Sequence, residues 1–348
     1  MKILITGNMG YVGSRLIKYL RIKYPESKLI GYDIGYFKDS LTNTKELPEL
    51  LLNVQYNRDL RNFDYNLLDG IDHIIHLAAI SNDPISNTFE KVTYDVNYHS
   101  SVKLAQMALK YNVKSFVFAS SCSVYGNGTL SARTELNDLN PLTAYSKSKI
   151  LTENEIKDLA KKNFSVSILR FATACGMSDR LRLDLVLNDF VASAITNKKI
   201  QILSDGSPWR PLIDVEDMCR AIDWAMLRKP TNNENLLTIN VGKNENNFQI
   251  KDLAYAVKEF FPEIEVTINS NALPDKRSYK VDFSLFSSLA ENYIPQKSIE
   301  ATINDIKSTL IKMNFNDPNF RESNLIRLQK LNYLINQKKI NNNLEWIE

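Results

Sequence analysis

A short strand, a glycine-rich turn and a helix follow one another at the start of the chain, and this order limits the fold more than any other feature. The apolar run KILIT leads into TGNMGYVG, and the helical pattern SRLIKYLRIKY comes directly after it. A turn of this kind points backbone N–H groups and the positive end of a helix dipole at a pyrophosphate. We therefore predict that a dinucleotide is bound by Gly7, Asn8, Met9, Gly10, Tyr11, Val12 and Gly13.

An acidic residue at the end of the second apolar run supports this prediction, because three glycines alone would also fit a purely structural turn. KLIGYD stops at Asp33, about twenty residues beyond Gly13, the usual spacing for a ribose-binding acid. A carboxylate there accepts hydrogen bonds from an adenosine ribose and repels a 2′-phosphate, so NAD is predicted over NADP. Asp59 falls where an adenine edge would lie, with Leu60 beside it, although a solvated surface position fits Asp59 equally well.

Short apolar runs alternate with helical patterns through the first half of the chain, as in HIIHLAA, SFVFAS and SVSILRF. Strands that are apolar on both faces and separated by helices indicate a parallel sheet covered on both sides. The predicted fold is α/β, a Rossmann-type doubly wound parallel sheet with a smaller C-terminal α/β substrate lobe. We expect an NAD-binding domain over 1–172, joined again by about 207–243, a substrate lobe over 173–315, and a polar C-terminal extension over 316–348.

Charge and composition limit the classes of partner and of binding site that can be expected. The 43 Lys and Arg residues nearly balance the 40 Asp and Glu residues, which gives no reason to expect a nucleic-acid or membrane-surface partner. No apolar run reaches membrane-spanning length, so a cytoplasmic protein is expected. Three cysteines without CxxC spacing and three histidines, all before residue 100, predict neither a disulfide framework nor a metal site.

Tyr145 and Lys149 are four residues apart in PLTAYSKSK, so a helix places both side chains on one face. Such pairs usually lie on solvated helix faces, but this one follows a dinucleotide turn and a serine cluster at a strand end. Lowering a tyrosine pKa from about 10 to neutrality takes roughly 4 kcal/mol, which a nearby ammonium and a positive nicotinamide ring can supply. We predict that Tyr145 removes a proton from a sugar hydroxyl while hydride leaves the same carbon for NAD.

TGNMGYVG, Asp33, SSCSVYG and YSKSK, in this order and spacing, resemble the extended short-chain dehydrogenase/reductase superfamily, in particular its NAD-dependent nucleotide-sugar epimerase/dehydratase family. The resemblance implies that Ser121 shares the substrate proton with Tyr145, and that Asn97 is the supporting catalytic asparagine. It also implies a homodimer formed through the helix that bears Tyr145. Contacts to the cofactor or the sugar are implied at Leu77, Ala78, Ala79 and Ser81.

The two residues after Ser121 discriminate between reactions within this family. Members that are 4,6-dehydratases resemble one another in carrying Asp-Glu there, an acid and a base, whereas this chain has Cys122 and Ser123. A 4,6-dehydratase is thus disfavoured. The remaining Ser-Tyr-Lys set suits reversible oxidation at one carbon, expected at C4, and predicts an epimerase. A 4-ketoreductase or dehydrogenase needs the same residues and stays open, as does a non-catalytic NAD-binding sensor.

An arginine before the helical pattern VEDMCRAIDWAML resembles the family's ligand for the nucleotide diphosphate of the substrate. This residue is Arg210, and a guanidinium fork suits paired phosphate oxygens. A surface ion pair with Asp214 or Glu216 is the alternative for Arg210, because such local pairs are common.

Three further substrate contacts are expected from the same resemblance. Asn188, in LVLNDF, matches the family's helix asparagine near the substrate phosphates. Arg277 stands in for a missing arginine of an RxGD pattern, and Thr173 replaces an asparagine found in UDP-galactose epimerases. These departures from the family pattern, together with Arg180 and Arg182 in CGMSDRLRLD, suit a substrate whose base or sugar differs from that of the UDP-galactose epimerases.

Overall fold

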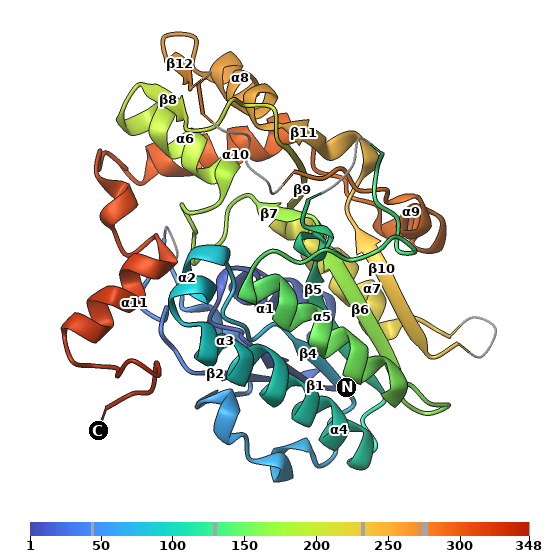
Figure 1. The fold of residues 1–348 in the computed structure, drawn as a ribbon. Helices are drawn as coiled ribbons and strands as arrows, with labels where there is room; N and C mark the ends of the chain where they lie inside the picture. Colours follow the sequence, from blue (N-terminus) through green and yellow to red (C-terminus); the bar gives the residue numbers. More distant parts are fainter. Residues whose placement is uncertain (43–44, 128–130, 231–233, 270, 273–277, 348) are drawn as a thin grey trace.

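A parallel sheet of seven strands forms the centre of the computed structural model, which describes residues 1–42, 45–127, 131–230, 234–269, 271–272 and 278–347 (Figure 1). Its strands are β1 (Lys2–Thr6), β2 (Lys28–Asp33), β3 (Val54–Asn57), β4 (His73–His76), β5 (Ser115–Ser121), β6 (Ser165–Phe171) and β10 (Leu236–Val241). They lie in the order β10-β6-β5-β4-β1-β2-β3, and all neighbouring pairs are parallel. The predicted Rossmann-type fold is confirmed.

Strand β1 lies between β2 and β4, so the chain winds outward from it in both directions. Ile5 is paired with Gly31 on one side and with Ile75 on the other. Doubly wound sheets bind ligands beyond the carboxyl ends of the strands where the winding reverses. The topology therefore places a ligand crevice beside the ends of β1 and β4.

Helices cover both faces of this sheet, and their apolar stripes explain why. On one face α1 (Tyr11–Lys23) and α7 (Val215–Leu227) pack together, with Leu16, Leu20 and Ile222 in a shared core. The other face carries α4 (Ser101–Lys110) and α5 (Ala144–Ile156), whose core includes Leu104 and Ile156. Two such layers leave the strand ends as the open side of the domain.

A smaller lobe stands above the strand ends and holds two short sheets (Figure 1). Strand β9 (Trp209–Asp214) lies between β7 (Thr173–Cys175) and β11 (Asn247–Gln249), while β8 (Lys199–Ile202) pairs with β12 (Glu265–Ile268). Its helices are α6 (Val186–Thr196), α8 (Ile250–Phe260) and α10 (Ile299–Lys312), and α9 (Ser284–Leu289) packs beside β10. Strand β9 belongs to this lobe. The chain therefore rejoins the main domain at α7, which packs on the sheet, and then at β10, which is part of the sheet.

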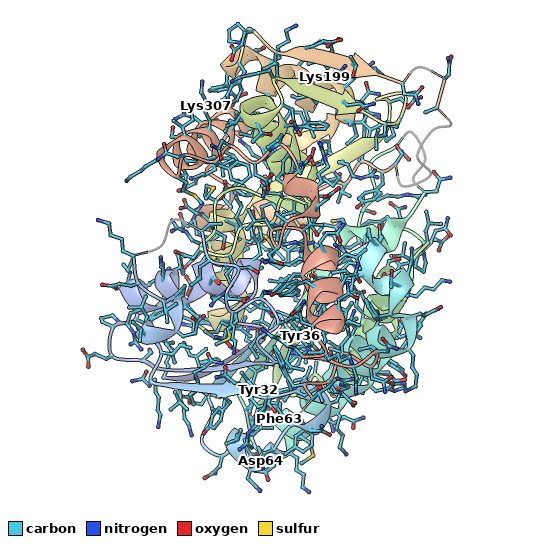
Figure 2. All side chains as sticks on the ribbon, turned by 90° about the vertical axis from the view of Figure 1, so that its left-hand side faces the viewer. Tyr32, Tyr36, Phe63, Asp64, Lys199 and Lys307 are labelled. Carbon is cyan, nitrogen blue, oxygen red and sulfur yellow. The ribbon has the colours of Figure 1, made fainter. Side chains whose placement is uncertain are left out.

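The end of the chain folds back onto the Rossmann half. Helix α11 (Arg327–Asn336) lies near the short helices α2 (Asp83–Thr88) and α3 (Glu90–Tyr94), and Figure 2 shows Tyr36 at its foot. Leu331, Leu334 and Leu344 form an apolar cluster with Tyr36 and Ile80. The segment predicted as a polar extension therefore buries an apolar face against the same chain. In the described residues, no helix has the length and apolarity needed to cross a membrane.

Candidate active site

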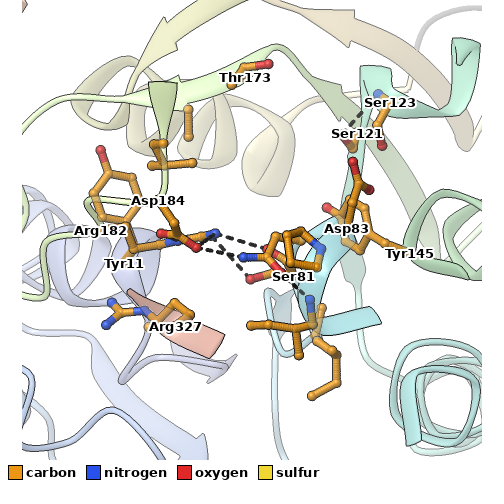
Figure 3. Close-up of a pocket in the computed structure, with 18 of the residues that line it drawn as sticks. Tyr11, Ser81, Asp83, Ser121, Ser123, Tyr145, Thr173, Arg182, Asp184 and Arg327 are labelled. Carbon is orange, nitrogen blue, oxygen red and sulfur yellow. Dashed lines mark hydrogen bonds and ion pairs between the residues drawn. The ribbon is translucent and has the colours of Figure 1, made fainter. Parts of the chain in front are cut away.

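A cavity of about 900 Å³ opens at the carboxyl ends of β1, β2, β4 and β5 (Figure 3). Its wall includes residues of the glycine turn, of α5, of the smaller lobe and of α11. Within the described chain, no group of His, Cys, Asp and Glu side chains has an arrangement suited to a metal ion. The predicted site residues that line the cavity are Gly7, Gly10, Tyr11, Val12, Gly13, Asp33, Asp59, Leu60, Leu77, Ala78, Ala79, Ser81, Ser121, Tyr145, Lys149, Thr173 and Arg210.

The glycine turn has the shape that a dinucleotide needs. Gly7 has φ +73°, and a Cβ on it would lie 2.5 Å from the backbone nitrogen of Ala78. A Cβ on Gly13 would lie 2.5 Å from the carbonyl oxygen of Gly7, so both positions require glycine. Gly10 precedes the first turn of α1 and supplies no capping side chain, which leaves the first-turn N–H groups for an anion. These residues fit the pyrophosphate of NAD.

Asn8 and Met9 do not line the cavity, although both were predicted as cofactor contacts. The buried Asn8 side chain donates a hydrogen bond from Nδ2 to Gln55 Oε1 at 2.7 Å. The backbone nitrogen of Met9 donates to Asp33 Oδ2 at 3.0 Å. Both residues therefore hold the turn in place from behind.

Asp33 ends β2 at the cavity wall, where the sequence predicts a ribose-binding carboxylate. Its Oδ1 accepts a hydrogen bond from the backbone nitrogen of Gly35 at 2.7 Å, while Oδ2 accepts the Met9 hydrogen bond. Burial raises the pKa of the carboxyl, and these two backbone donors counteract that shift. Asp33 thus holds the backbone of the turn and also lines the cavity.

Asp59 and Leu60 lie at the far end of the cavity, beyond β3. Asp59 caps a 3-10 turn (Leu60–Asn62), and Arg61 Nε donates to its two carboxylate oxygens at 3.0 and 2.9 Å. Arg61 therefore holds the Asp59 carboxylate at the cavity wall. The alternative, a solvated surface position for Asp59, differs from this arrangement.

Ser121 and Tyr145 come together from two different elements. Ser121 ends β5, and its Oγ accepts a hydrogen bond from the backbone nitrogen of Ser123 at 3.1 Å. Tyr145 is the second residue of α5, whose start is fixed by a capping box between Thr143 and Ser146. The Ser121 hydroxyl lies close enough to the Tyr145 phenol to lower its pKa, and Figure 3 shows the two side chains close together.

Lys149 lies one turn further along α5 and completes the predicted set. Its Nζ donates to the carbonyl oxygen of Ala119 at 2.8 Å and lies 5.6 Å from the centre of the Tyr145 ring. Burial lowers the pKa of this ammonium to about 7, while the charge of Glu153 raises it. An ammonium with that pKa is only partly charged at neutral pH.

The electrostatics of Tyr145 differ from the prediction. Burial raises its pKa to about 12; the hydrogen bond with Ser121 and the charge of Arg182 lower it, and Asp83 raises it. Arg182, and not Lys149, is the cation that acts on the phenol in this structure. A positive nicotinamide ring would supply the further stabilisation that a phenolate needs.

Asn97 lies behind α5 and does not line the cavity. It belongs to a π-helical turn (Asp95–Ser100), and its side chain is buried. Its Oδ1 accepts from the backbone nitrogen of Ile80 at 2.7 Å, while Nδ2 donates to Ser148 Oγ at 3.1 Å. The amide therefore joins the loop after β4 to α5.

Cys122 has no contact with the cavity. The side chain is fully buried, its Sγ lies 3.1 Å from the carbonyl oxygen of Arg170, and burial raises the pKa of the thiol well above its usual value. A protonated thiol in the core cannot act as the acid or base of a dehydratase.

Of the residues predicted to contact the substrate, some line the cavity and one is buried behind its wall. Thr173 begins β7 and lies close enough to the Tyr279 phenol to lower its pKa, and the guanidinium of Arg210 lies 5.5 Å from the centre of the Tyr279 ring. Asn188 is buried behind the wall, where Oδ1 accepts from the backbone nitrogen of Gly176 at 3.0 Å. Arg277 lies outside the described residues.

A polar cluster between Tyr11 and Tyr145 was only partly foreseen. Arg182 donates to Ser81 Oγ at 3.3 Å and pairs with Asp184 at 2.9 Å, and Figure 3 shows this set beside Asp83 and Tyr145. CGMSDRLRLD drew attention to Arg182, but nothing in the sequence indicated its partners.

Helix α11 also contributes to the wall, through Arg327 and Leu331. Tyr36 and Phe37, after β2, lie in the same part of the wall. Single residues in a loop or a weakly amphipathic helix carry no local signal of a binding site, and sequence reasoning missed all four.

A dinucleotide turn, an acidic residue after β2 and a Ser-Tyr-Lys set on a Rossmann sheet define an extended short-chain dehydrogenase/reductase. The model of the NAD dependent epimerase/dehydratase family matches residues 3–242, and the chain belongs to this family. It is therefore an enzyme of this type with NAD as its cofactor.

Named relatives of the chain differ in their reactions. An uncharacterised UDP-glucose epimerase of Bacillus subtilis (strain 168) is 33% identical over 259 residues, covering 70% of this chain and 78% of that protein. UDP-glucuronic acid decarboxylase 6 of Arabidopsis thaliana is 25% identical, covering 82% of this chain and 81% of the relative. Family membership alone therefore leaves the reaction open.

A solved structure shares the fold across most of the chain. It is the UDP-glucuronic acid 4-epimerase of Bacillus cereus in complex with UDP-glucuronic acid and NAD, with a TM-score of 0.76 and 25% identity. The alignment covers 90% of this chain and 100% of that one.

Proposed function

We propose that this enzyme is a nucleotide-diphosphate-sugar epimerase that oxidises one ring hydroxyl, at C4, and then reduces the resulting ketone from the opposite face. The observation that carries the proposal is the meeting of Ser121, Tyr145 and Lys149 at the cavity wall. No second acid–base pair follows Ser121, because Cys122 is buried in the core and Ser123 is a neutral hydroxyl. Transient oxidation needs one base and no group that eliminates water.

In this mechanism Tyr145 takes the proton of the C4 hydroxyl and later returns it. Ser121 lies beside the phenol and shares this proton, while the charge of Arg182 favours the phenolate and Lys149 is held one turn further along α5 by Ala119. NAD, when bound, accepts the hydride from C4 and gives it back. The 4-keto sugar turns over in the cavity between the two transfers, so mass is conserved and only the configuration at C4 changes.

The substrate class is supported by both the cavity and the relatives. Arg210 lies at the wall of the smaller lobe, where a guanidinium suits a diphosphate. The B. subtilis relative is named as a UDP-glucose epimerase, and the B. cereus structure holds UDP-glucuronic acid. A UDP-sugar is therefore the first substrate to test, and C4 is the first carbon.

The proposal also includes a homodimer that forms through the face bearing α4 and α5. Leu151, on α5, is an exposed apolar side chain of the kind that such an interface would bury. Light scattering tests this part, since a monomeric mass at micromolar concentration would contradict it. A cytoplasmic location stays a prediction.

The deciding experiment incubates the purified enzyme and NAD with UDP-, GDP-, dTDP- and CDP-sugars and follows the products by mass spectrometry and NMR. An epimerase gives unchanged mass with a new coupling pattern at C4. Loss of water would identify a dehydratase, and a two-hydrogen change would identify a net reductase or dehydrogenase. Either result contradicts the proposal, and no turnover of any sugar would favour a binding protein.

A further inference from the structure

Arg327, the first residue of α11, is a buried cation at the cavity wall. Its side chain is 2% exposed. Nη2 donates a hydrogen bond to the carbonyl oxygen of Arg180 at 2.7 Å, and the guanidinium lies 4.4 Å from the centre of the Phe37 ring. Nη1 has no hydrogen-bond partner among the described residues. In that part of the chain, no carboxylate forms an ion pair with Arg327.

The neighbouring buried cations are each compensated by an acid. Arg180 pairs with Glu49 at 2.7 Å, and Arg182 pairs with Asp184 at 2.9 Å. Lys330, also on α11, pairs with Asp39 at 2.8 Å. Arg327 therefore stands out as the cation of this group without an ion-pair partner of its own, although the charge of Asp184, which pairs with Arg182, also acts on it.

Burying a charge without a partner is unfavourable, so the folded chain has to stabilise Arg327 in another way. Burial lowers the pKa of the guanidinium to about 9; the positive charges of Arg182 and Arg180 lower it further, while the charge of Asp184 raises it. The pKa shift shows that the surroundings disfavour the cation. An anion bound in the cavity would remove this penalty.

The position of Arg327 identifies the part of the cavity that it faces. Figure 3 shows it below Tyr11, which belongs to the glycine turn. Phe37, under the guanidinium, follows β2. Arg180, which receives the Nη2 hydrogen bond through its carbonyl, donates its own Nη1 to Ser14 on α1 at 2.9 Å. Ser14 lies on α1, directly after the glycine turn, and Phe37 follows β2, so these contacts place Arg327 near the residues predicted to bind the cofactor.

We infer that Arg327 binds a phosphate oxygen of the ligand in this cavity, and that this ligand is the pyrophosphate of NAD. The turn offers backbone N–H groups to the pyrophosphate from α1, and Arg327 supplies the cation that the turn lacks. The diphosphate of a nucleotide sugar offers the same chemistry from the other half of the cavity. A segment beyond the family-matched residues 3–242 thus completes the cofactor site.

The packing of the C-terminal segment holds Arg327 in this place. Leu331 and Leu334 are buried with Tyr36, and Trp346 Nε1 donates to the carbonyl oxygen of Ile34 at 2.7 Å. The Tyr36 hydroxyl is hydrogen-bonded to the carbonyl oxygen of Leu344. An arginine on so firmly docked a helix is preorganised for a ligand.

Isothermal titration of the full-length protein with NAD and, separately, with UDP tests the inference. Arg327→Met and Arg327→Gln should weaken NAD binding about 10- to 100-fold, the usual effect of losing a charge-assisted hydrogen bond. Arg327→Lys should recover part of this loss. Lys330→Met is the matched control, because it removes a buried cation of the same helix that already has an acidic partner, and both affinities should change less than about twofold.

Titration with NAD and with UDP distinguishes a contact to the pyrophosphate of the cofactor from a contact to the diphosphate of the substrate. Weaker UDP binding with unchanged NAD binding would still support a phosphate contact but would assign it to the substrate. Unchanged affinity for both ligands in Arg327→Gln and Arg327→Lys would overturn the inference, as would equal losses in Lys330→Met.

Thermal unfolding without ligand gives an independent measurement. Removing a buried charge without an ion-pair partner should leave the Tm of Arg327→Met and Arg327→Gln equal to that of the wild type or above it, while the rise in Tm caused by added NAD shrinks. A lower Tm without ligand and a full NAD-induced rise would show that Arg327 serves only to hold α11, and would also overturn the inference.

Discussion

Lys149 Nζ donates a hydrogen bond to the carbonyl oxygen of Ala119 at 2.8 Å, which connects helix α5 to the end of β5. Both elements carry a member of the Ser-Tyr-Lys set, because Ser121 lies two residues beyond Ala119 on the same strand. The hydrogen bond therefore sets the distance between Tyr145 and Ser121 as well as the position of the ammonium. The consequences below depend on this arrangement and on its buried surroundings.

Replacing Tyr145 with Phe should lower the rate of epimerisation about 10²- to 10⁴-fold, because the variant has no proton acceptor. NAD affinity should stay within a few-fold, since the glycine turn and Asp33 are untouched. Steady-state kinetics and NAD titration measure both quantities. Tyr111→Phe, which removes an exposed phenol that donates to Asn66, is the control and should keep full activity.

Asp83 should set the pH range of the reaction through its charge, which raises the pKa of Tyr145. The phenolate is the active form, so Asp83→Asn should lower that pKa and move the rate–pH profile to lower pH, by up to about one unit. The amide oxygen of asparagine can still accept the hydrogen bond from Thr143. A profile that moves to higher pH, or stays in place, would show that Asp83 acts on another group.

Asp33→Asn should weaken NAD binding about tenfold, because the carboxylate that accepts the ribose hydroxyls loses its charge and one acceptor. NADP binding should change less or improve, since the charge that repels a 2′-phosphate is gone. Titration with both dinucleotides gives the comparison. Asp64→Asn is the control, as Asp64 caps a 3-10 turn (Tyr65–Leu68) away from the cavity, and an equal loss for NAD and NADP would contradict the ribose assignment.

Glu153 and Arg170 form a buried ion pair at 2.7 Å behind the catalytic residues. Glu153→Gln leaves Arg170 charged and without its partner, so the free energy of unfolding should fall by about 3 kcal/mol. Urea unfolding measures the change. Glu263→Gln, at an exposed pair with Lys198, should change it by less than about 1 kcal/mol, and equal effects at the two sites would argue against this difference in burial.

His76 should make the protein sensitive to acid. Burial lowers its pKa from 6.5 to about 3, and both ring nitrogens are hydrogen-bonded, to Thr6 and Ser101. His76 therefore takes up a proton near pH 6.5 in the unfolded chain but stays neutral in the folded chain at that pH. The free energy of unfolding falls as the pH drops from 6.5 towards 3.

When the pH is lowered from 7 to 5, protonation of His76 in the unfolded chain should lower the free energy of unfolding by about 2 kcal/mol. His76→Gln has no such proton to bind, so its free energy of unfolding should fall by about 2 kcal/mol less over the same interval. Urea unfolding at the two pH values makes the comparison. An identical pH dependence in both proteins would mean that His76 is not buried as the neutral form.

Much of the site was visible in the sequence because its parts are local. The glycine turn lies within seven residues of one strand, and Gly7 and Gly13 have close backbone contacts that leave no room for a side chain. Tyr145 and Lys149 share a helix face through their spacing alone. Ser121 could be placed beside them because parallel strands end at one edge of the sheet.

Other predicted residues have side-chain directions that depend on packing, which the sequence does not indicate. Asn8 and Asn188 lie at predicted positions, but their amides are hydrogen-bonded inside the protein, to Gln55 and to the backbone of Gly176. Lys149 was expected to lower the pKa of Tyr145, but its burial and its hydrogen bond to Ala119 lessen that effect. Burial and hydrogen bonds of this kind depend on the neighbouring elements.

By itself, the sequence determined the Rossmann-type sheet, the NAD-binding turn and the Ser-Tyr-Lys set, because short-range periodicity and spacing specify these features. Only the tertiary structure decided that Arg182 faces Tyr145 and that α11 brings Arg327 to the cavity wall. Arg327 is more than 300 residues from the glycine turn, and its place results from the burial of an apolar helix face against Tyr36. Hydrophobic packing between distant segments leaves no local pattern from which such a contact could be predicted.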